Sequence, residues 1–104
     1  EMTDWFAEIK ALTKARRAMA FAGLIAITLV LDGKGRVMAA PAILIEGIPK
    51  PVHEAIRLAV EDTTRRAKRA DPDELAEAVR RAARRAAHDA WGKKPVTRVT
   101  VVET

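Results

Sequence analysis

Residues 24–33, with the sequence Leu-Ile-Ala-Ile-Thr-Leu-Val-Leu-Asp-Gly, decide the fold of this chain of 104 residues. Apolar and β-branched residues fill every position up to Leu31, and Asp32-Gly33 then supplies a turn. The pattern therefore predicts a strand that ends in a tight reversal. A strand that is apolar on both faces is usually central in its sheet or covered on both sides. We expect residues 24–31 to be the central strand.

The longer apolar run of residues 18–31 follows a basic segment at residues 14–17 and superficially resembles a signal peptide. It is shorter than the roughly 20 residues that a membrane-spanning helix needs, and the acids Asp4 and Glu8 do not fit a cationic leader. Charged residues make up 32% of the chain, the net charge is +5 and cysteine is absent. This composition excludes a membrane-embedded protein and is compatible with a reducing compartment. We expect a cytoplasmic location and no membrane partner.

The segments on either side of the central strand have patterns of their own. The turn at residues 32–35 favours a hairpin, so residues 36–46 are predicted to return as its second arm. Upstream, apolar residues at a spacing of three to four predict a helix over residues 4–20. Downstream, Gly47 and the prolines that follow it break the sheet and start another helix over residues 51–69.

The clearest local signal in the chain is Asp71-Pro72-Asp73-Glu74. It combines a helix cap, a proline suited to the first helical position and a capping-box glutamate. The helix that begins there has an apolar stripe made mostly of alanines, and it is predicted to end at Gly92. The alternating pattern of residues 96–102 predicts a third strand.

The predicted order of elements is α-β-β-α-α-β, and the fold class is α+β. Following the chain from strand to strand makes the first and third strands parallel. Because residues 24–31 are expected to be central, the spatial order of the strands is 2-1-3. We expect a three-stranded mixed sheet with two helices packed on one face.

Side chains suited to catalysis are scarce. The chain has no serine and no cysteine, which excludes serine and cysteine nucleophiles. His53 and His88 fall on different helices and off their apolar stripes, so both are expected to face solvent, and neither has a second metal ligand at helical spacing. Glu46 is a single carboxylate at a strand end. We expect no catalytic residue and no metal site in this sequence.

A band of arginines lies opposite the apolar stripe of the last predicted helix. The candidates for RNA contact are Arg80, Arg81, Arg84 and Arg85. One interpretation is a face that contacts phosphates and gains affinity from counterion release. The other is a solvated helix surface on which Glu77 pairs with Arg81 at i+4. The sequence favours the solvated surface, because no aromatic residues are interleaved for base stacking.

Three apolar residues are candidates for a protein–protein interface: Trp91, Leu58 and Trp5. Trp91 either packs in the core, which is the default for tryptophan, or anchors an interface, where tryptophan is enriched. Leu58 is predicted to be exposed on its helix. Trp5 lies on the first predicted helix, ahead of the compact unit, and is interpreted as a contact to upstream parts of a longer protein.

Taken from end to end, the chain resembles the C-terminal domain of ribonuclease J, a nuclease of the metallo-β-lactamase/β-CASP superfamily. The resemblance covers residues 16–103 and is carried by the order and spacing of short segments. These segments are Arg16-Arg17, the strand and turn from Leu24 to Gly33, Pro41-Ala42-Ile43, Gly47, Asp73-Glu74-Leu75, Val79-Arg80-Arg81 and residues 93–103. It implies that residues 1–20 are a linker helix from an upstream catalytic part and that residues 21–104 are the C-terminal domain.

The resemblance also implies a role in RNA processing and decay. Members of the family degrade RNA 5′ to 3′ from a monophosphorylated end and also cut it internally. Their catalytic domain, which is absent from this sequence, holds two zinc ions, so no cofactor is expected in this fragment. RNA is then the substrate of the parent enzyme. The C-terminal domain is expected to support self-association of the parent subunits and thereby its activity.

Two other functions remain open. The same element order is found in type II K-homology domains, which would make the chain a free-standing RNA-binding module. Such a domain needs a Gly-x-x-Gly loop between its adjacent helices, whereas residues 68–72 contain no glycine. The remaining alternative is an α+β domain whose partner is another protein, with Trp91 or Leu58 as the anchor.

Overall fold

The structure is a computed structural model that describes residues 22–67 and 71–104. The predicted helix over residues 4–20, and Trp5 with it, lies outside the described residues. The five elements follow the predicted order from the central strand onward. They are β1 (Leu24–Leu31), β2 (Ala42–Glu46), α2 (Lys50–Arg66), α3 (Pro72–Trp91) and β3 (Val96–Glu103).

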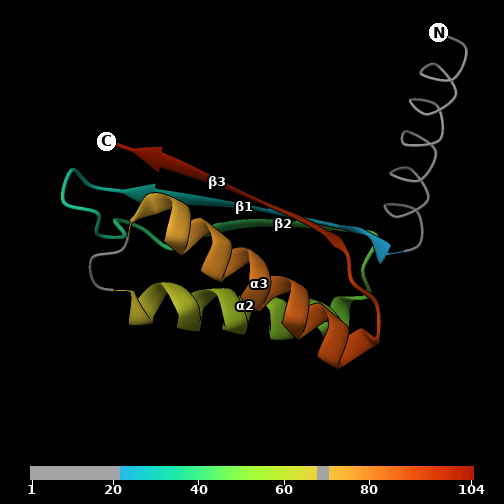
Figure 1. Cartoon of the computed structure of the whole chain (residues 1–104). Helices are drawn as coiled ribbons and strands as arrows, with labels where there is room; N and C mark the ends of the chain where they lie inside the picture. The colour runs from blue at the N-terminus through green and yellow to red at the C-terminus, as the bar shows by residue number, and fades with distance from the viewer. Residues whose placement is uncertain (1–21, 68–70) are drawn as a thin grey trace, which may run out of the picture.

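The three strands form one mixed sheet in the order β2-β1-β3. β1 pairs with β2 in antiparallel and with β3 in parallel orientation, and the parallel register runs from Leu24 opposite Val96 to Leu31 opposite Glu103. The chain therefore leaves β1, forms the hairpin and both helices, and returns alongside β1 in the same direction (Figure 1). The predicted strand order 2-1-3 and the central place of residues 24–31 are confirmed.

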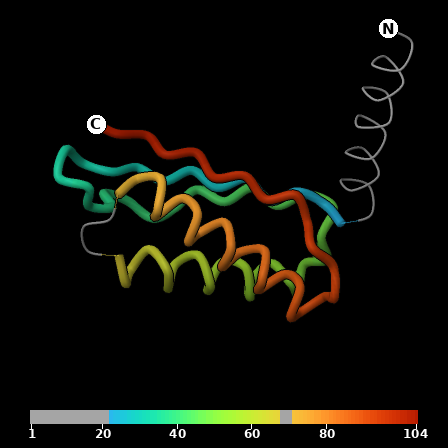
Figure 2. The backbone as a smooth tube through the Cα atoms, viewed as in Figure 1, coloured from blue at the N-terminus to red at the C-terminus, as the bar shows by residue number. Residues whose placement is uncertain are grey.

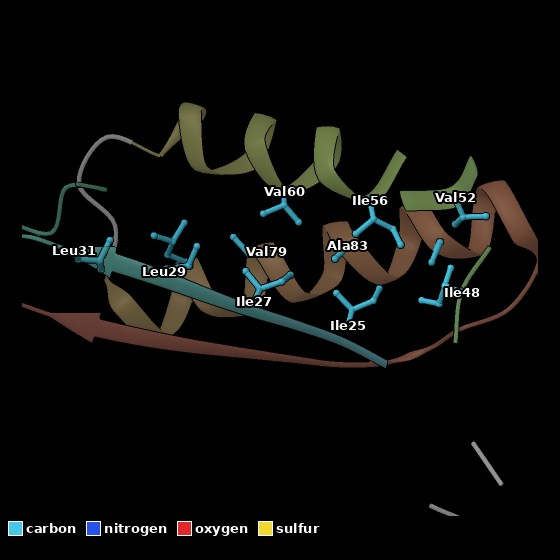
Figure 3. Packing of buried hydrophobic residues seen from close by; sticks show 12 residues of the cluster. Ile25, Ile27, Leu29, Leu31, Ile48, Val52, Ile56, Val60, Val79 and Ala83 are labelled. Atoms are coloured by element: carbon cyan, nitrogen blue, oxygen red, sulfur yellow. The ribbon is translucent and has the colours of Figure 1, made fainter. Parts of the chain in front are cut away.

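Both helices pack on one face of the sheet (Figure 1). Side chains alternate along β1, and every second one is buried beneath the helices. The close-up in Figure 3 shows these side chains meeting those of α2 and α3. The fully or nearly buried core consists of Ile25, Ile27, Leu29, Leu31, Ile48, Val52, Ile56, Val60, Leu75, Val79, Ala83 and Ala87.

The opposite face of the sheet is covered by none of the described helices (Figure 1). Directly paired residues share a face, so the register places Leu44 beside Ala26 and Val102 beside Val30 on this side. Leu44 is 54% exposed and Val102 is 44% exposed. We call this surface the open sheet face. Its apolar and β-branched residues are Leu24, Ala26, Thr28, Val30, Ala42, Leu44, Val96, Thr100 and Val102, and its charged residues are Glu46 and Arg98.

The second strand is shorter than the predicted residues 36–46. An isolated bridge joins Leu31 to Val37, and the Met38 N–H donates to the carbonyl oxygen of Val30 at 2.9 Å. Regular pairing resumes only at Ala42. Between these points the chain leaves the ladder at residues 39–41, where Pro41 has no N–H to donate. The predicted hairpin is confirmed, and its second arm is a regular strand only from Ala42 to Glu46.

Helix α3 begins and ends at its predicted signals. A side-chain oxygen of Asp71 accepts a hydrogen bond from the Glu74 N–H at 3.3 Å. At the other end Gly92 has a left-handed φ of 80°, and its N–H donates to the His88 carbonyl oxygen at 2.7 Å. This conformation is costly for a residue with a side chain. It turns the chain back from the helix layer towards the sheet, as the tube in Figure 2 shows.

Candidate functional site

The four predicted arginines are brought together on the exposed side of α3. They line an open cavity of about 450 Å³, which we call the arginine groove. Its residues are Arg80, Arg81, Arg84, Arg85, His88, Asp89 and Lys94. The groove therefore combines one side of a helix with a residue from the connection between α3 and β3.

Helical spacing explains why the arginines share one side. Arg80 and Arg84 are four residues apart, as are Arg81 and Arg85, and residues at this separation are neighbours on a helix surface. The opposite side of the helix is fixed by burial, since Val79, Ala83 and Ala87 lie in the core. Packing of the alanine stripe thus orients the arginines towards solvent.

Glu77 neutralises part of this positive charge. Its carboxylate accepts two hydrogen bonds from Arg80, at 2.6 and 2.9 Å, and one from Arg81 at 3.0 Å. Hydrogen bonding from Arg80, followed by that from Arg81, lowers the pKa of Glu77 from its ordinary value of 4.5 to about 2. Arg80 is consequently held in place, while Arg81 remains 76% exposed.

The other cations of the groove are less constrained. The Arg85 guanidinium lies 3.9 Å from the carboxylate of Asp89, and its side chain is 85% exposed. Within residues 22–67 and 71–104, no ion pair involves Arg84 or Lys94. With Glu77 included, the groove contains five permanent cations, the four arginines and Lys94, and two carboxylates, Glu77 and Asp89. Its field is positive and directed to solvent.

Sequence reasoning missed Lys94 and His88 as members of this surface. Lys94 joins the arginines because the left-handed turn at Gly92 returns the chain along the end of α3. The available signal was the pair Lys93-Lys94 directly after a predicted helix end. The predicted pairing of Glu77 with Arg81 is confirmed, whereas the tighter bidentate pair with Arg80 was not predicted.

The three interface candidates lie in different surroundings. Trp91 packs against the core cluster while staying partly exposed, and the Lys93 Nζ lies 4.7 Å from the centroid of its ring. Leu58 is 53% exposed on α2, in the helix layer rather than on the open sheet face. Trp5 is outside the described residues. Their roles at an interface stay predictions, and the structure adds the open sheet face as a larger apolar surface.

The histidines do not form a catalytic or metal-binding centre in the described part of the chain. The Nε2 of His53 lies 2.7 Å from the Ile48 carbonyl oxygen and, because that oxygen only accepts, the ring donates there. His53 is thus partly buried, and the prediction that it faces solvent was wrong. His88 lies in the arginine groove. No group of three or more potential ligands among the described residues is arranged to hold a metal ion.

Within residues 22–67 and 71–104, no helix is both long enough and apolar enough to cross a membrane. The described residues form a small α+β domain with a basic side on α3 and an apolar sheet face. Residues 12–104 match the family model of the ribonuclease J C-terminal domain, and the chain belongs to that family.

A curated relative supports the same assignment. The chain is 36% identical over 98 residues to the ribonuclease J of Sinorhizobium meliloti (strain Sm2011 / Rm2011 / 2011). This similarity covers 85% of the present chain but only 17% of the relative. The sequence thus corresponds to a small part of the ribonuclease J that it resembles.

Proposed function

We propose that this chain is the accessory C-terminal domain of a ribonuclease J, and that it supports association of the parent subunits. Through that association it supports RNA processing and decay by the parent, as a 5′–3′ exonuclease and an endonuclease in the cytoplasm. The described residues offer no ligand cluster for the two zinc ions that the family resemblance implies. The proposal assigns the zinc ions and the phosphodiester chemistry to an upstream domain.

The observation that carries the proposal is the open sheet face. A sheet with one solvated face normally alternates apolar residues inward with polar residues outward. Here the outward positions of β1 are Leu24, Ala26, Thr28 and Val30, and two exposed aliphatic residues flank them. Burying such a surface releases hydrophobic free energy in proportion to its area. We infer that it is covered by a second copy of the same domain in the assembled enzyme.

The area of the open sheet face limits how strongly two isolated domains can associate through it. β1 and β3, with eight residues each, are about 26 Å long, β2 with five residues is about 17 Å long, and three strands are about 14 Å across. One copy therefore offers roughly 350 Å², less than half of the roughly 800 Å² per partner in a standard stable interface. We expect the isolated domain to associate weakly and the parent enzyme to supply the remaining contact area.

Two leucines of nearly equal exposure provide a matched test. Leu44 lies on the open sheet face and is 54% exposed, whereas Leu58 lies on α2 and is 53% exposed. In the full-length parent, Leu44→Asp is expected to shift subunits towards smaller species in sedimentation velocity and to lower RNA turnover. Leu58→Asp should leave both unchanged.

Two outcomes would contradict the proposal. One is that association of the parent subunits and RNA turnover both remain unchanged when residues 21–104 are deleted. The other is loss of association in Leu58→Asp but not in Leu44→Asp, which would indicate that the interface lies on the helix layer.

A further inference from the structure

We propose that the arginine groove binds the sugar–phosphate backbone of single-stranded RNA through its cations and without reading base sequence. The choice of RNA as the polyanion rests on the proposed function as part of a ribonuclease J. The groove lies on the helix layer, whereas the open sheet face lies on the other side of the sheet. A bound strand and a second subunit therefore occupy different surfaces.

The spacing of the arginines suits a chain of phosphates. An α-helix rises about 1.5 Å per residue, so residues four apart are separated by about 6 Å along the axis. Arg80 with Arg84, and Arg81 with Arg85, form two such steps side by side. Lys94 extends the positive surface beyond the helix. An extended strand can place successive phosphates along this row.

The location on α3 favours a polyanion over a single phosphate. The groove runs along the middle and C-terminal half of α3, which ends at Trp91. The C-terminus of a helix carries a partial negative charge from its free carbonyls, so backbone amides supply no anion site there. Affinity must come from several side-chain cations acting together, which is the mode by which proteins bind nucleic-acid backbones.

The residues of the groove also determine the kind of recognition. None of the seven is a tyrosine, phenylalanine or tryptophan, so the groove offers no aromatic platform for bases. Glu77 ties up Arg80 more tightly than Arg81. The cations most available to phosphates are Arg81, Arg84, Arg85 and Lys94. If these four cations each neutralise one phosphate of a single strand, a plot of the logarithm of the association constant against the logarithm of the salt concentration has a slope of about −3.

The test is fluorescence anisotropy of the 104-residue chain with a 5′-labelled oligouridylate of 15 nucleotides, titrated at several salt concentrations. Arg84→Ala and Lys94→Ala each remove a cation of the groove for which the described residues offer no ion-pair partner. Each is expected to weaken binding about fivefold at 0.1 M salt and to reduce the magnitude of the salt slope by about 0.7. The double variant should lose about 25-fold.

Lys34→Ala is the matched control. Lys34 is exposed in the turn after β1, has no ion pair among the described residues, and lies neither in the arginine groove nor on the open sheet face. Its removal lowers the net charge by the same amount but should change affinity less than twofold. Glu77→Gln should tighten binding, because it releases Arg80 and Arg81 from their carboxylate partner.

Three results would overturn this inference. The first is no salt-dependent RNA binding by the chain. The second is equal weakening in Lys34→Ala and Arg84→Ala, which would indicate attraction by net charge alone. The third is unchanged or weaker binding in Glu77→Gln. None of these results bears on the subunit association tested with Leu44→Asp, so the two proposals can fail separately.

Discussion

Gly23 lies directly against Ile48 where β1 begins. A Cβ atom on Gly23 would stand 2.6 Å from Cγ1 of Ile48 and 2.6 Å from the carbonyl oxygen of Glu46. Gly23 also has a φ of +76°, in the region that favours glycine. Since Ile48 is a buried member of the core, this contact fixes the start of the central strand against the turn between β2 and α2.

Replacing Gly23 is therefore expected to destabilise the domain. Gly23→Ala should lower the free energy of unfolding by about 3 kcal/mol, from the left-handed backbone and the clash with Ile48 together. Gly33→Ala is the control, because a Cβ there meets nothing within 4 Å and its φ is not positive. It should change stability by less than about 1 kcal/mol. Urea denaturation followed by circular dichroism measures both, and equal midpoints for the two variants would refute the expectation.

The alanines of α3 allow the helix to approach the core closely. Ala83 is fully buried among the core residues, so Ala83→Leu should cost about 2 kcal/mol through overpacking. Ala90 is exposed on the same helix, and leucine is nearly as good a helix former as alanine. Ala90→Leu should leave the thermal midpoint nearly unchanged. If Ala83→Leu were as stable as the unsubstituted chain, the core around Ala83 would have room for the larger side chain.

The N-cap of α3 is expected to contribute measurably to stability. Asp71→Ala removes the acceptor of the Glu74 N–H and should lower the free energy of unfolding by about 1 kcal/mol. Asp73→Ala removes a carboxylate from the same first turn and should cost roughly half as much, through the helix dipole alone. Guanidinium titrations of the two variants distinguish these effects, and a larger loss in Asp73→Ala would contradict the assigned cap.

The ion pairs of Glu77 predict a dependence of stability on pH. The pKa of Glu77 is about 2 in the folded chain and about 4.5 as its ordinary value. Its contribution is therefore present above pH 4.5 and is lost as the pH falls towards 2. Because the carboxylate is exposed, the effect should be small and should shrink with added salt.

The measurement compares urea midpoints of the wild type and Glu77→Gln between pH 2 and pH 7. The wild type should be more stable above pH 4.5, and the difference should close between pH 4.5 and pH 2. A difference that persists unchanged at pH 2, or that grows as acid is added, would disagree with the assignment.

Much of the fold could be predicted because its signals are local. The unbroken apolar run of residues 24–31 identifies the central strand, and Asp71 and Gly92 mark both ends of α3 through backbone preferences. The length of β2 could not be predicted. Residues 36–46 contain enough apolar side chains for a strand, and Pro41 by itself does not show that pairing with β1 stops after Met38 and resumes at Ala42.

The candidate site was predictable only in part. Helical spacing alone places Arg80, Arg81, Arg84 and Arg85 on one side of α3. The position of Lys94 depends on how the chain turns after Gly92, which is a tertiary property. In the same way, the sequence shows that β1 is apolar on both faces, but not which face the helices leave open.

The long-range pairing of Leu24 with Val96 has a consequence for biosynthesis. On the ribosome, β1 emerges well before the strand that completes its parallel ladder, and both helices must be made in between. During that interval an apolar strand has one edge unpaired and is open to wrong association. We expect the rate of translation, and chaperones that shield nascent residues 24–31, to change the yield of folded protein. Neither should change the free energy of unfolding of the completed chain.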